Sequence, residues 1–127
     1  MIDRVQWSTG VAAGAAGSAT AMGYSPEVHG LVVAVHVAYV DSPPATTDIT
    51  LSDEADPASE AIVNLADANT DVKVYPRRQV QDNTGAGLTY DATEPVAEPY
   101  VVHGRLEAVI AGANAGDSVT VTVWLEC

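Results

Sequence analysis

Three basic side chains, Lys73, Arg77 and Arg78, lie within six residues of an otherwise acidic chain. The 127 residues contain five Lys and Arg against 17 Asp and Glu, for a formal charge of −12. Guanidinium groups bind carboxylates well, often through two parallel hydrogen bonds. In a strand the two arginines would point to opposite faces. Two arrangements are open. In the first, both arginines form internal ion pairs that hold the loop. In the second, one arginine pairs with Asp82 or Asp91 while the other binds an acidic partner.

Aromatic side chains accompany this basic segment. Tyr75 precedes the two arginines, Tyr90 follows the glycine-containing turn after them, and Trp124 alternates outward on a predicted strand. Tyrosine and tryptophan are enriched at protein interfaces. We therefore expect Tyr75, Tyr90 and Trp124, together with Arg77 and Arg78, to contact a partner.

Residues suited to catalysis are sparse. His29, His36 and His103 are not at metal-ligand spacing, and the single thiol, Cys127, is 24 residues beyond His103. The motifs of serine hydrolases, zinc proteases and phosphate-binding loops are missing. The sequence predicts no enzyme and no cofactor, with His36 in the core or at an interface. Cys127 is expected to be an exposed inert thiol or to form an intersubunit disulfide.

Two acidic segments contain oxygen ligands of the kind that calcium binds. They are Asp53, Glu54, Asp56 and Glu60, and then Asp67, Asn69 and Asp71. Neither has the ordered spacing of a calcium-binding loop. Solvated acidic loops are therefore expected, with no metal.

The charge balance excludes several partners. An acidic surface repels nucleic-acid phosphates and anionic lipid headgroups, so neither nucleic acid nor membrane is expected as a partner. Abundant Asp with a single lysine is typical of proteins from halophilic archaea and their viruses, and GC-rich phages share the tendency. Residues 1–7 show no signal peptide, and the Ala-rich segment 10–23 is too short and too weakly apolar to cross a bilayer. We expect a soluble protein that is not exported.

Alternating apolar residues predict strands in a single domain, residues 1–127. Ser118–Leu125 has a half-buried pattern with its valines inward, whereas Leu31–Val40 is apolar on both faces, as in a central or docked strand. Shorter runs bounded by turn residues are Thr47–Ser52, Ala61–Leu65, Val72–Tyr75, Arg77–Gln81, Leu88–Tyr90, Tyr100–Val102 and Gly104–Ile110. Residues 1–27 are expected as an N-terminal arm or an edge hairpin, in which Val5–Val11 pairs with Ser18–Tyr24. Many short strands indicate an all-β sandwich or barrel, with at most one helical turn after Asp56-Pro57.

The order of these segments resembles the small β-sandwich proteins encoded in head-gene clusters of tailed phages and archaeal tailed viruses. The resemblance covers about residues 28–125. The residues that carry it are Gly30–Val35, Tyr39, Pro44–Leu51, Asn69–Asp71, Tyr75–Arg78, Asp82–Gly85, Leu88–Asp91, Pro95-Val96 and Gly116–Val121.

This resemblance implies a jelly-roll-like antiparallel sandwich that serves as a capsid decoration (cement) protein on the outer surface of a virion. Its partners would be the major capsid protein and further copies of itself, with a trimer favoured. The motifs are structural, so no binding residue is transferred from the family. Two alternatives stay open: a receptor- or carbohydrate-binding module of a virion spike, and a tail or adaptor protein.

Overall fold

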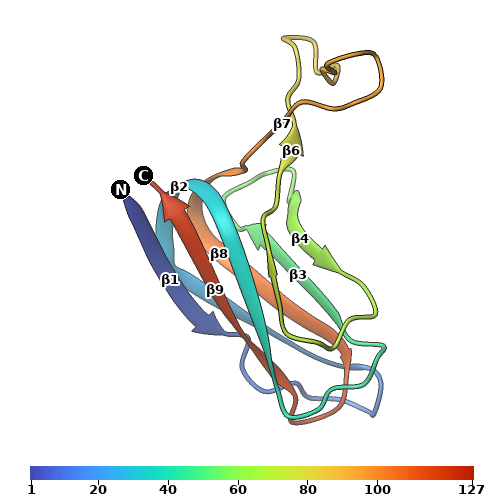
Figure 1. The fold of residues 1–127 in the computed structure, drawn as a ribbon. Helices are drawn as coiled ribbons and strands as arrows, with labels where there is room; N and C mark the ends of the chain where they lie inside the picture. The colour runs from blue at the N-terminus through green and yellow to red at the C-terminus, as the bar shows by residue number, and fades with distance from the viewer.

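The computed structural model describes all residues, 1–127, and contains nine strands and no helix (Figure 1). The strands are β1 (Ile2–Ser8), β2 (Ala19–Val40), β3 (Asp48–Asp53), β4 (Ala61–Leu65), β5 (Val72–Val74), β6 (Arg78–Gln79), β7 (Ala97–Glu98), β8 (Val101–Ala113) and β9 (Ser118–Glu126). A helix long and apolar enough to cross a membrane is absent. The predicted all-β fold is confirmed.

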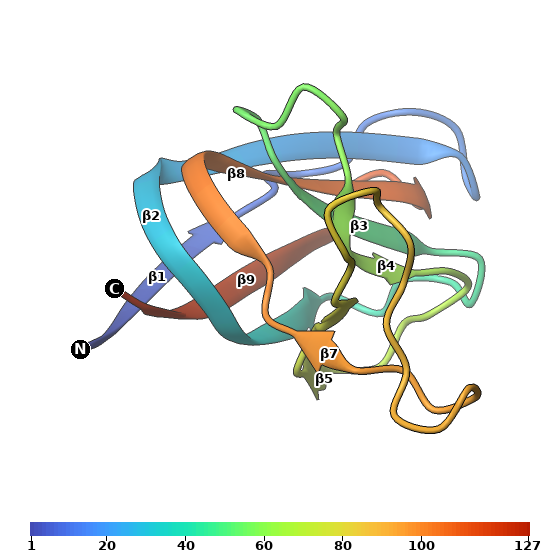
Figure 2. The same ribbon diagram turned by 90° about the horizontal axis from the view of Figure 1, so that it is seen from above.

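One long, bent strand joins two antiparallel layers. The sheet order is β1-β9-β2-β8-β3-β4, and β5 pairs separately with β2. The second half of β2 lies between β9 and β5, whereas its first half pairs with β8. The change of partner falls at Leu31, which is opposite both Val101 and Glu126. Gly30, with φ +132°, precedes it, and a side chain there would overlap the Glu126 carbonyl. The result is a sandwich-like arrangement (Figure 2).

Valine, leucine and isoleucine from both layers fill the core. Leu106 and Ile110 of β8 and Val121 and Val123 of β9 are almost completely buried. Each such side chain contributes about 1.5–3 kcal/mol of hydrophobic stabilisation. The inward valines predicted for the last strand are therefore confirmed.

A β-bulge explains why Leu31–Val40 looks apolar on both faces. The register of β2 against β9 shifts between Val32 and Ala34. An extra residue at a bulge switches the side of the strand on which later side chains lie. Val32, Val35 and Val37 consequently all enter the core, while Leu31 is exposed. Strict alternation, which would place Leu31 on the same face as Val35, therefore fails at this end of the strand.

The N-terminal pairing was also predicted incorrectly. β1 pairs along its whole length with β9, from Ile2 opposite Glu126 to Ser8 opposite Thr120. Residues 19–24 belong to β2 and pair with β8 instead. A single side-chain bond, from Trp7 Nε1 to the Gly23 carbonyl at 3.1 Å, links β1 to this part of β2. Complementary registers far apart in the sequence outweigh the local hairpin.

Residues 78–98 form an arm that projects beyond the sandwich (Figure 1). Its base is the β6–β7 pair, and backbone bonds among Val80, Leu88 and Val96 continue it. The expected strand Leu88–Tyr90 is not a continuous strand: Thr89 forms an isolated bridge with Pro95, and Leu88 and Tyr90 form backbone hydrogen bonds on either side of it. No side chain of the arm belongs to the hydrophobic core or packs against it. The arm is therefore held by its own hydrogen bonds and by contacts at its base.

Candidate partner-binding surface

Pairing registers place several chemically distinctive side chains on one exposed face of the β1-β9-β2-β5 layer. Arg4 is opposite Trp124, and His36 is opposite both Thr122 and Lys73. Residues directly opposite each other in a sheet point to the same side, as do residues two apart in one strand. Arg4, Trp124 and Lys73 therefore share a face.

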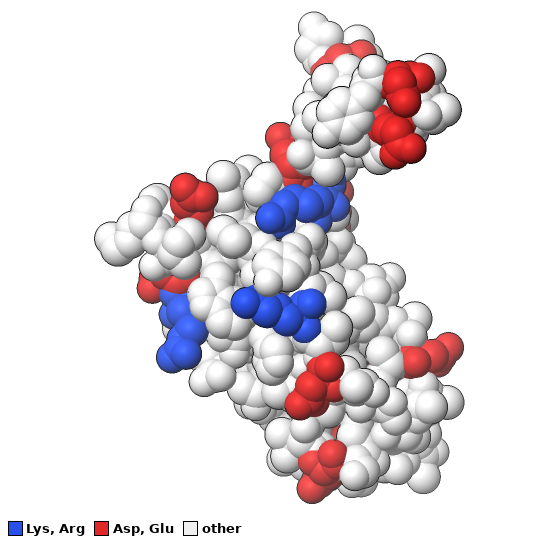
Figure 3. Space-filling model, in the orientation of Figure 1, with Lys and Arg blue, Asp and Glu red and all other residues white.

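Tyr75 and Arg77 extend this face toward the base of the arm. Tyr75 is 60% exposed, and the Arg77 guanidinium reaches back to β2. We call the set Arg4, Lys73, Tyr75, Arg77 and Trp124 the basic–aromatic face. Figure 3 shows Lys and Arg side chains on this side of the sandwich, with Asp and Glu at the tip of the arm and also around the edges of the sandwich.

Lys73 is held between two aromatic rings. Its ammonium nitrogen is 4.4 Å from the centroid of the Trp124 ring and 5.5 Å from that of Tyr75. Cation–π contacts at exposed sites contribute about 0.5–1 kcal/mol each. They orient the lysine without neutralising its charge, so the ammonium remains available to a carboxylate.

The two neighbouring arginines have different environments. Arg78 forms ion pairs with Glu98 at 3.3 Å and with Glu60 at 4.0 Å. Arg77 Nη1 donates instead to the backbone carbonyls of Val33, at 3.1 Å, and Pro76, at 2.8 Å. The prediction that one arginine is used internally is confirmed, and that arginine is Arg78.

The predicted internal partners, Asp82 and Asp91, were wrong because both carboxylates stabilise their own turns. Asp82 Oδ1 accepts hydrogen bonds from the Thr84 hydroxyl and from the Thr84 and Ala86 amides. Asp91 Oδ1 does the same for Thr93 and the Glu94 amide. Short side chains of this type bind nearby backbone groups in turns.

Those hydrogen bonds stabilise the charged form of each carboxylate. The Thr84 hydroxyl, followed by the turn amides, lowers the pKa of Asp82. The Glu94 amide, followed by Thr93, lowers the pKa of Asp91. Both carboxylates therefore remain ionised at the tip of the arm to a lower pH than an ordinary aspartate.

Three of the five cationic side chains have no carboxylate partner in a chain that contains 17 acids. All the ion pairs involve Arg78 or Arg105, which leaves Arg4, Lys73 and Arg77. These three are the cations of the basic–aromatic face. The face therefore has unused capacity to bind negatively charged groups.

The structure brings together three of the five predicted contact residues. Tyr75, Arg77 and Trp124 lie on the basic–aromatic face, whereas Arg78 is at the base of the arm. Tyr90 belongs to the arm itself and is 76% exposed. The sequence prediction omitted Arg4, because only the β1–β9 register places it opposite Trp124.

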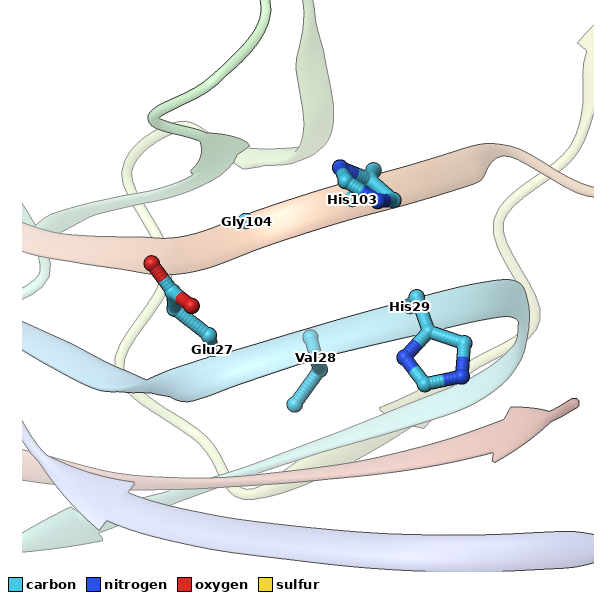
Figure 4. Close-up of a pocket in the computed structure, with 5 residues that line it drawn as sticks. All are labelled: Glu27, Val28, His29, His103 and Gly104. Atoms are coloured by element: carbon cyan, nitrogen blue, oxygen red, sulfur yellow. The ribbon is translucent and has the colours of Figure 1, made fainter.

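The histidines do not form a converging site. His29 of β2 and His103 of β8 are opposite each other and border a shallow hollow with Glu27, but their rings do not point toward each other (Figure 4). No group of three or more His, Cys, Asp or Glu side chains is arranged to hold a metal ion. The buried carboxylate of Asp53 instead accepts the Ala55 and His103 amides.

No known family model matches the chain, and no curated protein is significantly similar to it. The surface chemistry of the molecule is therefore the basis for a function.

Proposed function

We propose that this protein is a structural virion protein that binds the outside of a tailed-virus capsid and stabilises the shell. The observation that carries the proposal is the basic–aromatic face, where Arg4, Lys73 and Arg77 lack carboxylate partners beside Tyr75 and Trp124. Cations next to exposed aromatics are suited to an acidic protein surface. The resemblance in segment order supports a capsid as the source of that surface.

The strength of such attachment would come from repetition. An exposed ion pair contributes only about 0.2–1 kcal/mol. Several copies that bind together raise the effective concentration of each further contact. Binding only to the assembled shell would also stabilise that shell by mass action. A small face with three free cations is adequate for this role.

The same face is less suited to carbohydrate. Sugar-binding modules stack a sugar ring on an exposed aromatic side chain, whereas the Trp124 ring already has the Lys73 ammonium 4.4 Å from its centroid. The ammonium over the ring competes with stacking on that side. The geometry therefore favours a protein partner with carboxylates.

The test is binding to capsid shells assembled from the major capsid protein of the tailed virus to which the proposal assigns this chain. We expect saturable co-sedimentation and a higher disruption temperature of the shells. Arg77→Gln should weaken binding by up to about fivefold per contact, because it removes an unpaired cation. Arg105→Gln is the matched control, because it removes one positive charge that is already paired with Glu54 on the other layer.

Failure of the wild-type protein to bind shells across salt concentrations would overturn the proposal. Equal losses in the Arg77 and Arg105 variants would show that net charge, and not this face, governs attachment. Saturable binding to glycans in place of shells would support a receptor-binding module.

A further inference from the structure

The arm has a charge opposite to that of the basic–aromatic face. It carries Asp82, Asp91 and Glu94 at its tip, and no Lys or Arg occurs between Gln79 and Glu98. The face has three cations without carboxylate partners, so the two surfaces carry equal numbers of charges of opposite sign. One chain therefore contains both halves of an electrostatically complementary contact.

The tip carboxylates are oriented by their turns and still have a free oxygen. All the hydrogen bonds that the two aspartate side chains accept end on Oδ1 of Asp82 or Oδ1 of Asp91, so each Oδ2 accepts none. Glu94 contributes only backbone groups to the turn. Three carboxylates are thus presented to an external cation by a backbone that is already ordered, which lowers the entropic cost of binding.

The arm also exposes apolar surface. Tyr90 is 76% exposed and Leu88 is 41% exposed, and neither contacts the core. Tyr75 and Trp124 provide an aromatic surface of the same kind on the face. Exposed apolar groups bordered by complementary charges are typical of protein interfaces.

The arm does not use its own face. No hydrogen bond or ion pair joins residues 79–97 to Arg4, Lys73 or Trp124, and the β6–β7 base directs the tip away from the sandwich (Figures 1 and 3). Any copy with a free face therefore also has a free arm. A neighbouring copy therefore supplies a free acidic arm for every free basic–aromatic face, because both surfaces belong to the same chain.

We infer that the acidic arm of one copy docks on the basic–aromatic face of a second copy, with Asp82, Asp91 and Glu94 opposite Arg4, Lys73 and Arg77. The contact is heterologous, so it closes into a ring when the rotation between copies permits. The inference rests on the proposed function only in treating the face as a binding surface. The arm of a second copy and an acidic capsid surface would compete for that face, and self-association itself needs no capsid.

The single lysine makes this contact directly testable. A carbodiimide joins a carboxylate to an amine only when the two are in contact, and Lys73 is the only side-chain amine. Equal amounts of unlabelled and ¹⁵N-labelled protein are mixed, cross-linked and digested. We expect peptides joining Lys73 to Asp82, Asp91 or Glu94, including pairs with one labelled and one unlabelled partner. Lys73→Arg keeps the charge and removes the amine, so association should persist while the cross-link disappears.

Charge reversal provides a second test that does not depend on cross-linking. Arg77→Glu damages the face and Glu94→Lys damages the arm, while both leave the Asp82 and Asp91 turns intact. Each variant alone should raise the apparent Kd of self-association by about tenfold or more. An equimolar mixture should associate more tightly than either variant, because the intact arm of one meets the intact face of the other.

A wild-type protein that stays monomeric up to millimolar concentration would overturn the inference. So would an oligomer whose cross-links join Lys73 to carboxylates outside the arm, or variants that do not rescue each other. Capsid binding by a monomer would leave the proposed function standing and remove this contact. Self-association without capsid binding would leave this contact standing and remove the proposed function.

Discussion

The base of the arm offers the sharpest contrast between two adjacent side chains. Replacing Arg78 with Met removes the ion pairs to Glu98 and Glu60 and keeps the aliphatic part of the side chain. The three side chains are 32%, 44% and 51% exposed, so solvent screens both pairs. About 1 kcal/mol in total is a reasonable loss for two such pairs. Because the arm lacks core contacts, the loss should appear as local opening of residues 78–98 and not as global unfolding.

Native-state hydrogen exchange measures that opening directly. The Val80, Leu88 and Val96 amides, which bond within the arm, should exchange about fivefold faster in Arg78→Met, as expected for about 1 kcal/mol. Core amides of β9 should be unaffected. Arg77→Met is the matched control: it loses only bonds to backbone carbonyls, so arm exchange should change by less than about twofold. Equal acceleration in both variants, or none in Arg78→Met, would refute the assignment of the two arginines.

Three further predictions concern the core, the closure of the sandwich and pH. Leu106→Ala should lower the free energy of unfolding by about 2–5 kcal/mol, whereas Val101→Ala, at a site that is 73% exposed, should change it by less than about 0.5 kcal/mol. Denaturant titration measures both values, and similar losses in the two variants would contradict the placement of Leu106 in the core. Gly23→Ala should cost about 1–3 kcal/mol in thermal unfolding, since a Cβ there would overlap the Ser8 carbonyl; an unchanged melting temperature would argue against this close approach. The pKa values of Asp82 and Asp91 are lower in the folded arm than the ordinary value of 3.8, so their stabilisation is complete above that value and is lost as pH falls through the lowered pKa values. The Thr84 and Thr93 amide resonances should therefore shift with a midpoint below pH 3.8, and a midpoint at or above that value would contradict the turn geometry.

Regular alternation allowed the sequence to predict the all-β fold and the inward valines of β9. Patterns of period two depend only on which side of a strand faces the core, so they are readable without knowing the partner strand. The bulge in β2 is not readable in this way. Its extra residue is defined by the register against β9, and both possible faces of Leu31–Val40 are apolar.

The residues of the candidate surface that are close in sequence were predicted, whereas the contacts that depend on the tertiary fold were not. Arg77 and Arg78 are adjacent in sequence, so alternation in a strand predicted different environments for them, although only Arg78 lies in a strand, β6. The identity of the internal partner did not, because Glu60 and Glu98 approach Arg78 only through the tertiary fold. Arg4 and Trp124 likewise become neighbours only when the two terminal strands pair.

Chemical protection of Lys73 tests the central claim most directly, because the chain has one side-chain amine. Acetylation is followed by mass spectrometry on the dilute free protein and on the assembled protein, which is either self-associated or bound to shells. The Met1 amine is the internal reference. We expect Lys73 to be modified in the free protein and strongly protected after assembly, relative to Met1. Equal modification of Lys73 in the two states would show that the basic–aromatic face stays open to solvent, and would contradict its role as a binding surface.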